Sequence, residues 1–318
     1  MTTNIFRAFS TCLFYGKHEL LNSSIVKQLR EEIALTRSLC RESTHKNKVT
    51  AVNVFERFLT ETQQHTTVTI KTVTPDHFKA FECWLLKHGY SPNYAALHMR
   101  CLRALINRIN GNGSQLFSNV RTSNCQTMKR AVNAYTIKQL NNMKLPFGSA
   151  IAQARDIFLF CFYCMGIPLI DAVMLKKNQV MDRCISYRRQ KTGRLVNIPI
   201  SQELSQLIQR LSISSSIYLL PILTSENKTE TYHQYKRFYQ RYRRNLLKLD
   251  KLLKDDVHLT SYTARHTWAS IVYQHGGNIN AISRALGHTN TNTTYSYIRD
   301  INDSELATTN EIALKAIM

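Results

Sequence analysis

Apolar side chains recur every three or four positions through the first 110 residues, and this spacing constrains the fold more than any other feature of the sequence. Serine, threonine and proline stand where such stretches begin, and glycine stands where they end, as expected at helix termini. The pattern predicts four helices, which begin at Ser23 or Ser24, at Lys48, at Thr74 and at Ser91; the last three end at Thr62, Gly89 and about Ile109.

The second half of the chain mixes helices with one strand pair. Helices are predicted from Thr136 to Met143 and from Ala150 to Met165. The stretch from Cys184 to Ile200 is strand-like on both sides of Lys191-Thr-Gly193, which predicts a β-hairpin. From Gln202 onward the pattern is mostly helical again. The fold class is therefore mainly α, with a small antiparallel β-sheet in the second half.

A chain of 318 residues is longer than one compact core usually needs, so we expect two domains. The polar, basic stretch near residues 118–132 separates them. The expected parts are an N-terminal arm (1–22), a four-helix domain (23–115), a linker (116–134), a larger mixed domain (135–302) and a tail helix (303–318). The tail has apolar residues at helical spacing: Leu306, Ile312, Leu314 and Ile317.

Positive charge is in large excess. Forty-two Lys and Arg face 21 Asp and Glu, which gives a net charge of +21. Because the cations are spread along the whole chain, we expect a long groove that follows a nucleic-acid backbone; the alternatives are a merely basic protein or one that binds acidic membranes. No apolar stretch reaches the ~18–20 residues needed to cross a bilayer, and Ile5 to Tyr15 makes a poor signal peptide.

The eight cysteines predict no disulfide framework, because a chain of this length does not need one. Reduced thiols fit a cytoplasmic protein. Cys161 and Cys164 form a Cys-x-x-Cys, but they lie in a strongly apolar stretch without a second ligand pair, so we interpret them as buried helix residues and expect no metal.

Residues suited to phosphodiester chemistry gather near the C-terminus. Arg265, His288, Tyr295 and Tyr297 lie within about forty residues. An arginine binds a phosphate through two parallel hydrogen bonds, a histidine exchanges protons near neutral pH, and a tyrosine can be a nucleophile when cations lie beside it. Together they indicate transesterification through a covalent phosphotyrosine.

The spacing of these residues resembles the signature of tyrosine recombinases, the phage integrase family of site-specific recombinases. Arg265 matches the arginine of the family's His-x-x-Arg box, and His288 ends its Leu-Gly-His motif. Tyr297, nine residues further on, matches the nucleophile. The Lys191 hairpin resembles the one that carries the family's catalytic lysine, and the helix beginning at Ser91 resembles the last helix of the family's N-terminal domain. The likeness extends from Ile25 to Tyr297.

Two positions depart from that signature. Tyr262 stands where the box histidine would be, and its hydroxyl can still bind a phosphate oxygen or relay a proton. Pro168 stands where the family has its first catalytic arginine, in Gly166-Ile-Pro168-Leu-Ile-Asp171. We hypothesise that another guanidinium replaces the missing one; the candidates are Arg155, Arg188 and Arg189.

The resemblance implies a SAM-like core-binding domain and a mainly helical catalytic domain that close around double-stranded DNA. It implies a 3′-phosphotyrosyl intermediate on Tyr297, a phosphate held by Arg265 and His288, and proton transfer by Lys191 and Tyr262. Neither a cofactor nor a metal is expected. Such enzymes act as homo-tetramers on two DNA sites, and we expect a monomer or dimer when DNA is absent. The implied location is the cytoplasm, on the nucleoid.

Further cations are candidates for DNA contact; the alternative for each is an ordinary solvated face. These candidates are Arg100, Arg103, Lys129, Arg130, Lys236, Arg237, Arg241 and Arg244. Lys191 has a similar alternative as an ordinary turn residue. The tail at 303–318 either docks in a neighbouring protomer or packs on its own subunit.

Two other functions compete with recombination. One is a topoisomerase of type IB, which uses the same chemistry without exchanging DNA partners. The other is a recombinase-derived accessory protein that binds DNA and has lost its activity through Pro168.

Overall fold

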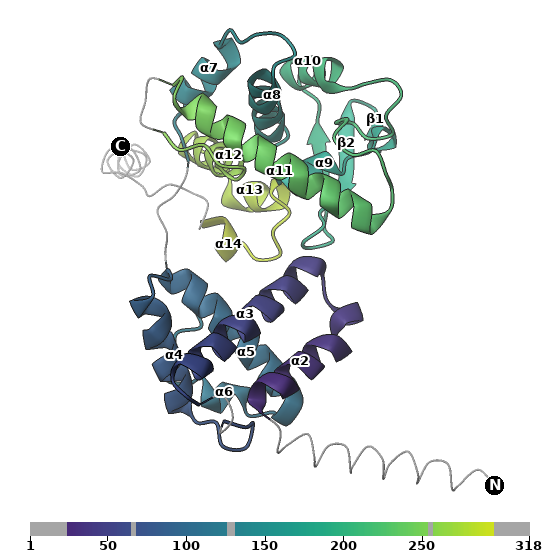
Figure 1. The fold of residues 1–318 in the computed structure, drawn as a ribbon. Coiled ribbons are helices and arrows are strands. Elements are labelled where there is room, and N and C mark those ends of the chain that lie inside the picture. Colours follow the sequence, from purple (N-terminus) through teal and green to yellow (C-terminus); the bar gives the residue numbers. More distant parts are fainter. Residues whose placement is uncertain (1–23, 65–67, 126–130, 254–256, 296–318) are drawn as a thin grey trace, which may run out of the picture. The chain divides into compact units, whose positions relative to one another are not determined.

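The computed structural model describes residues 24–64, 68–125, 131–253 and 257–295. The predicted arm at 1–22 and the tail helix at 303–318 lie outside these ranges. The chain divides into two compact units, residues 1–127 and 128–318, called unit 1 and unit 2 (Figure 1). The predicted fold class is confirmed, because helices dominate the described residues of both units and those of unit 2 include a small antiparallel sheet.

Unit 1 is a bundle in which α3 packs against α2 and α5, and α4 packs against α5 (Figure 1). Ser24 caps α2 by accepting a hydrogen bond from the amide of Lys27, and proline occupies the first turn of both α4 and α5. The elements of unit 1 are α2 (Ile25–Leu35), the 3-10 helix η1 (Arg37–Leu39), α3 (Glu42–Glu61), α4 (Pro75–Lys87), α5 (Pro92–Asn110) and the short α6 (Gly113–Leu116).

Helix α3 begins six residues before the predicted position at Lys48, and this prediction was wrong. Its first turns are polar, so they carry no apolar spacing. Glu42 stabilises the start of the helix because a carboxylate interacts favourably with the positive end of the helix dipole, and it also pairs with Arg37 and Lys46.

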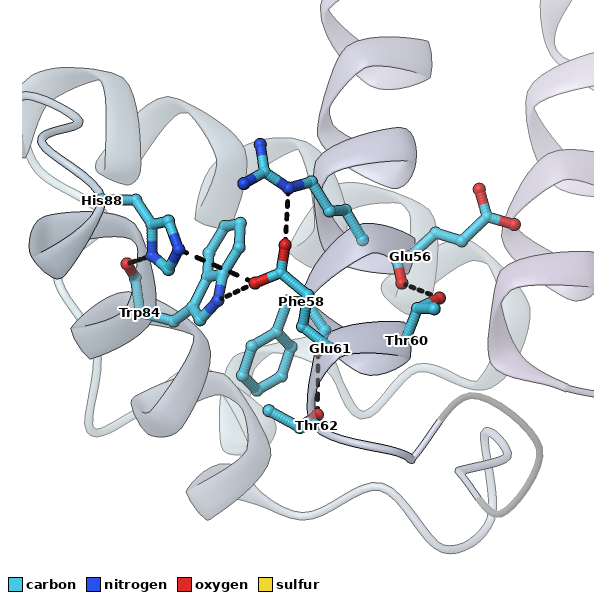
Figure 2. A network of polar contacts seen from close by, with 8 residues as sticks. Glu56, Phe58, Thr60, Glu61, Thr62, Trp84 and His88 are labelled. Carbon is cyan, nitrogen blue, oxygen red and sulfur yellow. Dashed lines mark hydrogen bonds and ion pairs between the residues drawn. The ribbon is translucent and has the colours of Figure 1, made fainter.

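Aromatic rings fill the core of unit 1. Phe55 contacts Phe78 and Phe81, with ring centroids 5.6 and 5.0 Å apart. At the edge of this cluster, Figure 2 shows the Glu61 carboxylate of α3 facing α4, where it accepts a hydrogen bond of 2.9 Å from the indole of Trp84. Glu61 also accepts a bond of 2.8 Å from Arg57. These contacts fasten the end of α3 to α4.

The stretch that follows α6 is held by unit 1. Phe117 and Val120, inside the segment expected as a linker, are buried in its core. Downstream, four side chains bond the segment from Arg121 to Cys125. The carboxylate of Glu82 accepts a hydrogen bond from the Arg121 amide, and Arg100 and Arg103 donate to Thr122. The side-chain amide of Asn93 donates to the carbonyl of Cys125 and accepts from its backbone amide. The chain therefore leaves unit 1 only after Cys125.

Unit 2 is built around α8, which packs against α7, α10, α11 and α12 (Figure 1). This helix is buried on nearly every side, as its continuous apolar sequence predicts. Cys161 and Cys164 are each 1% exposed, which confirms that they are buried residues of this stretch. Burial raises the pKa of the Cys161 thiol to about 12.

The predicted hairpin is confirmed. Strand β2 pairs with β3 from Cys184↔Pro199 to Arg188↔Leu195, and the two-residue β1 pairs with the other edge of β2. Ile185 and Tyr187 face the core and Arg188 faces away, so the next residue, Arg189, faces inward again.

The elements of unit 2 follow in chain order. They are α7 (Ala134–Asn142), α8 (Ala150–Tyr163), α9 (Leu169–Val173), η2 (Lys177–Gln179), β1 (Val180–Met181), β2 (Cys184–Arg188), β3 (Leu195–Pro199), α10 (Gln202–Leu211), α11 (Lys228–Asp250), α12 (Thr263–Gln274), α13 (Ile279–Ala285) and α14 (Asn292–Tyr295). In the described residues, no helix is both long enough and apolar enough to cross a membrane.

Candidate active site

Arg265 lies in the first turn of α12 and is only 1% exposed. Its Nη1 donates to the carbonyl of Gly166 at 2.8 Å, and its Nη2 donates to the carbonyl of Leu286 at 2.5 Å. Gly166 has φ +71°, and a Cβ there would lie 2.9 Å from the Cα of Arg265. The absence of a side chain at Gly166 therefore lets the loop after α8 approach the arginine closely enough to fix its guanidinium.

His288 follows α13 and is 3% exposed. Because a guanidinium can only donate, the contact of 3.1 Å between Arg265 Nη2 and His288 Nε2 makes Nε2 the acceptor. The other ring nitrogen, Nδ1, then carries the proton and donates to Thr294 Oγ1 at 2.9 Å. The imidazole is neutral and fixed at both nitrogens.

The electrostatics of the site agree with this assignment. Burial lowers the pKa of His288 to about 3, and three neighbouring positive charges add to the effect, those of Arg265, Arg189 and Lys191. The structure thus brings together the predicted arginine, histidine and lysine from α12, the segment after α13 and the hairpin turn. Lys191 itself is exposed in that turn.

Pro168 is the N-cap residue of α9, so the position of the missing arginine serves here to begin a helix. Asp171 in that helix is 4% exposed, and its Oδ1 accepts a hydrogen bond of 3.1 Å from the backbone amide of Gln190. Asp171, the acidic residue of the Gly166–Asp171 stretch, therefore binds the hairpin at the start of its turn.

Only one of the three candidate replacement arginines lies beside Arg265. The Nη1 of Arg189 donates to the carbonyl of Leu286 at 2.9 Å, the same carbonyl that Arg265 binds, and to that of Gly287 at 3.1 Å. Arg155 instead bonds Asp156 and the carbonyl of Met143.

The third candidate, Arg188, is exposed on the outer face of β2 and bonds the carbonyl of Gly193. Arg189 is 3% exposed, and its Nε has no hydrogen-bond partner among the described residues. Of the three candidates, Arg189 is therefore the one whose guanidinium lies beside that of Arg265.

Tyr262 is the N-cap residue of α12, one helical turn before Arg265, and it is 43% exposed. It lines a polar cavity of about 240 Å³ together with Tyr239 and Arg243 of α11 and with His258. The side chain of Tyr262 is thus partly exposed to solvent.

Tyr297 lies outside the described residues. The closest described part of the chain is α14, whose Thr294 is fully buried and holds His288. Tyr295 is 53% exposed. The expectation that Tyr297 faces Arg265 remains a prediction.

The predicted DNA-contacting residues fall into three groups. Lys236, Arg237, Arg241 and Arg244 are exposed on α11, opposite a buried face that includes Phe238. Among the described residues, no carboxylate forms a salt bridge with any of these four cations. Arg100 and Arg103 bond Thr122 in unit 1, and Lys129 and Arg130 lie outside the described residues.

Sequence reasoning missed one contact of the hairpin turn. Thr192, directly after Lys191, donates through Oγ1 to the carbonyl of Gly287 at 3.0 Å. The residue stands in the Lys-Thr-Gly turn that the sequence had singled out, but turn residues do not follow the alternation of a strand. Its direction could therefore not be read from the pattern.

Two family models match the sequence. The model of the phage integrase family matches residues 137–303, which is more than half of the chain. The model of the phage integrase SAM-like domain matches residues 24–108, which include the four main helices of unit 1 except the last residues of α5. A comparison with curated proteins gave no match.

Solved structures with the same fold have low sequence identity. The Tn1549 transposon integrase in complex with a circular intermediate DNA is similar with a TM-score of 0.66 and 14% identity, over 92% of this chain and 99% of that one. A lambda integrase dimer bound to a COC′ core site is similar with a TM-score of 0.65 and 14% identity, over 91% and 80%. A lambda integrase tetramer bound to a Holliday junction has a TM-score of 0.63 and 12% identity, over 90% and 81%.

Proposed function

The chain belongs to the phage integrase family, and on this basis we propose that it is a site-specific recombinase that cuts and rejoins duplex DNA. The observation that carries the proposal is the buried group of Arg265, Arg189 and His288, with Lys191 at its edge. Two buried guanidiniums that share one carbonyl oxygen create a strongly positive site, and a phosphodiester is the anion that this family processes.

In the proposed reaction, the phenol oxygen of Tyr297 attacks the scissile phosphorus. A bond forms between that oxygen and phosphorus, and the bond from phosphorus to the 5′-oxygen breaks. The ammonium of Lys191 gives its proton to the departing 5′-oxygen, while the phenol proton passes by way of Tyr262 to solvent. The product is a 3′-phosphotyrosyl bond and a free 5′-hydroxyl, and a 5′-hydroxyl from the partner DNA reverses the attack.

The role of the two guanidiniums is to bind the non-bridging oxygens, on which charge grows in the transition state. Arg189 supplies the guanidinium that Pro168 cannot. Its Nη1 is engaged with two carbonyls, and its Nε is buried without a partner among the described residues, so Arg189 contributes mainly its positive charge beside Arg265. His288 enters as a neutral hydrogen-bonding group.

The exposed cations of α11 bind the DNA backbone outside the scissile phosphate, and the active assembly is a tetramer on two sites, in the cytoplasm. Support for backbone contact is the lack of carboxylate partners for Lys236, Arg237, Arg241 and Arg244 among the described residues.

The test recovers covalent adducts. Cells that express the chain are lysed in detergent, the DNA is sheared, and the DNA bound to the denatured protein is purified and sequenced. The wild type should yield a small set of sites, and Tyr297→Phe should yield none. Tyr295→Phe, two residues away, is the matched control and should behave like the wild type.

The same experiment separates the alternatives. Absence of adducts in the wild type, with normal DNA binding, would identify an accessory protein instead. Adducts without strand exchange between two copies of the recovered site, combined with relaxation of a supercoiled plasmid, would identify a topoisomerase. Loss of adducts in Arg189→Ala but not in Arg155→Ala or Arg188→Ala is expected if Arg189 is the replacement guanidinium.

A further inference from the structure

The tip of the hairpin is fastened to the segment that carries His288. Three side chains of the turn reach the backbone of residues 286–289. Arg189 donates to the carbonyls of Leu286 and Gly287, Thr192 donates to that of Gly287 at 3.0 Å, and Arg194 makes a longer contact of 3.5 Å to that of Thr289. All four contacts connect residues 95 to 98 positions apart in the sequence.

The carbonyl of Gly287 is the centre of this connection, because it accepts from both Arg189 Nη1 and Thr192 Oγ1. Gly287 has φ +63°, and a Cβ there would lie 3.0 Å from Val196 Cγ2 and 3.1 Å from Arg189 Cδ. A glycine at this point therefore lets the segment lie directly against the hairpin. The carbonyl is thus held close enough for a short side chain such as threonine to reach it.

The two contacts differ in what they can position. Arg189 directly follows β2, whose last paired residue is Arg188, and its side chain is buried. Thr192 lies in the turn itself, next to the exposed Lys191, where the main internal restraints are the backbone bonds that close the turn between Arg189 and Gly193 and between Arg189 and Arg194. Before Lys191, the carboxylate of Asp171 holds the amide of Gln190; after Lys191, the hydroxyl of Thr192 is the side-chain contact that ties the turn to the segment carrying His288.

We infer that Thr192 is a positioning residue, which holds the ammonium of Lys191 at the 5′-oxygen by tying the hairpin turn to the carbonyl of Gly287. The inference rests on the proposed function, in which Lys191 is the general acid. Threonine acts here through its hydroxyl and not through its volume. Its loss should impair protonation of the leaving group while the phosphate remains bound by Arg265 and His288.

The experiment compares two leaving groups. A nicked duplex is made from a site recovered in the adduct experiment, once with the normal 5′-oxygen and once with sulfur in its place at the scissile bond. A thiol has a pKa of about 8.5 and so leaves as a thiolate without receiving a proton. A defect limited to the general acid is therefore suppressed by the sulfur substrate, whereas damage to the phosphate-binding residues or to the fold is not.

Thr192→Val removes the hydroxyl and keeps the shape, and Thr192→Ser keeps the hydroxyl. We expect Thr192→Val to slow adduct formation on the oxygen substrate on the order of 100-fold, the lower end of what a general acid contributes. On the sulfur substrate it should react within a few-fold of the wild type. Thr192→Ser should be close to the wild type on both substrates.

Ser186→Ala is the matched control, because Ser186 lies on the same hairpin and its hydroxyl bonds Asn197 on the exposed face. It should react normally with both substrates. An equal defect of Thr192→Val on the two substrates, or no defect on either, would overturn the positioning role. If the wild type itself formed no adduct, the proposed function would fail instead.

Discussion

Replacing Gly166 by alanine should displace the side chain of Arg265, and the expected loss of folding stability follows from the geometry. At φ +71° a side chain costs about 1–2 kcal/mol relative to glycine. The new Cβ would also lie 2.9 Å from the Cα of Arg265, a backbone atom that no rotamer change can move. The loop must shift, and the charged hydrogen bond from Arg265 to the Gly166 carbonyl, worth about 1.5–3 kcal/mol, is weakened or lost. The total expected loss of stability is about 3–5 kcal/mol.

Gly148 provides a close control, because it has the same φ of +71° but no atom within 4 Å of the position of a Cβ. Gly148→Ala should therefore lose only the conformational part, about 1–2 kcal/mol. The difference between the two variants isolates the contact with Arg265.

The assay is urea unfolding of the full chain in a Trp84→Phe background. The chain has two tryptophans, so this leaves Trp268 on α12 as the only indole and reports on unit 2. Adduct formation is measured in parallel. Gly166→Ala should lower it by on the order of 10–100-fold, since a misplacement of about 1 Å in a catalytic group costs that much. Equal stability of the two variants, or full cleavage by Gly166→Ala, would refute the reasoning.

Three other outcomes are expected. The pKa of His288 is near 6.5 in the unfolded chain and about 3 in the native site, so the free energy of unfolding should fall as pH drops through this window. His288→Asn should flatten that decline. Urea midpoints of both proteins from pH 7 to 4 measure the effect, and parallel curves for the two proteins would contradict the expectation. Replacing Arg241 and Arg244 together by alanine should reduce the slope of log affinity for DNA against log salt by about 2, if both bind phosphates; an unchanged slope in a fluorescence-anisotropy titration would place them off the DNA. Phe158→Ala, in the fully buried centre of α8, should cost about 3–5 kcal/mol of stability in the same urea assay, and a loss below 1 kcal/mol would mean that the core of unit 2 is not organised around α8.

Apolar spacing and helix-capping residues were enough to predict the helices of unit 1, because each one buries a single face. The start of α3 was missed for the same reason. Its first turns bury little and are held by charge, through Glu42 with Arg37 and Lys46, and charge pairs leave no periodic signal in a sequence.

The site shows a similar limit. The motifs identified Arg265, His288 and Lys191, which the fold brings together, but they left three arginines open as the replacement at Pro168. Strand alternation could have narrowed the choice between Arg188 and Arg189. Arg189 lies two residues after Tyr187 and therefore faces the core as Ile185 and Tyr187 do, whereas Arg188 faces away. No pattern could have shown that Arg155 is engaged by the carbonyl of Met143, or that Arg100 and Arg103 bond Thr122, since those contacts depend on packing between separate segments.

The anchoring of Arg121–Cys125 on unit 1 sets the length of the tether between the two units. On the other side, the amide of Val132 donates to Thr267 Oγ1 of α12, so the chain is fixed again at that point. Seven peptide steps separate Cys125 from Val132 and reach about 25 Å when fully extended. Under the proposed function, this connection of about 25 Å at most restricts the two units of one polypeptide to a single contiguous stretch of DNA, and it excludes binding to two distant stretches.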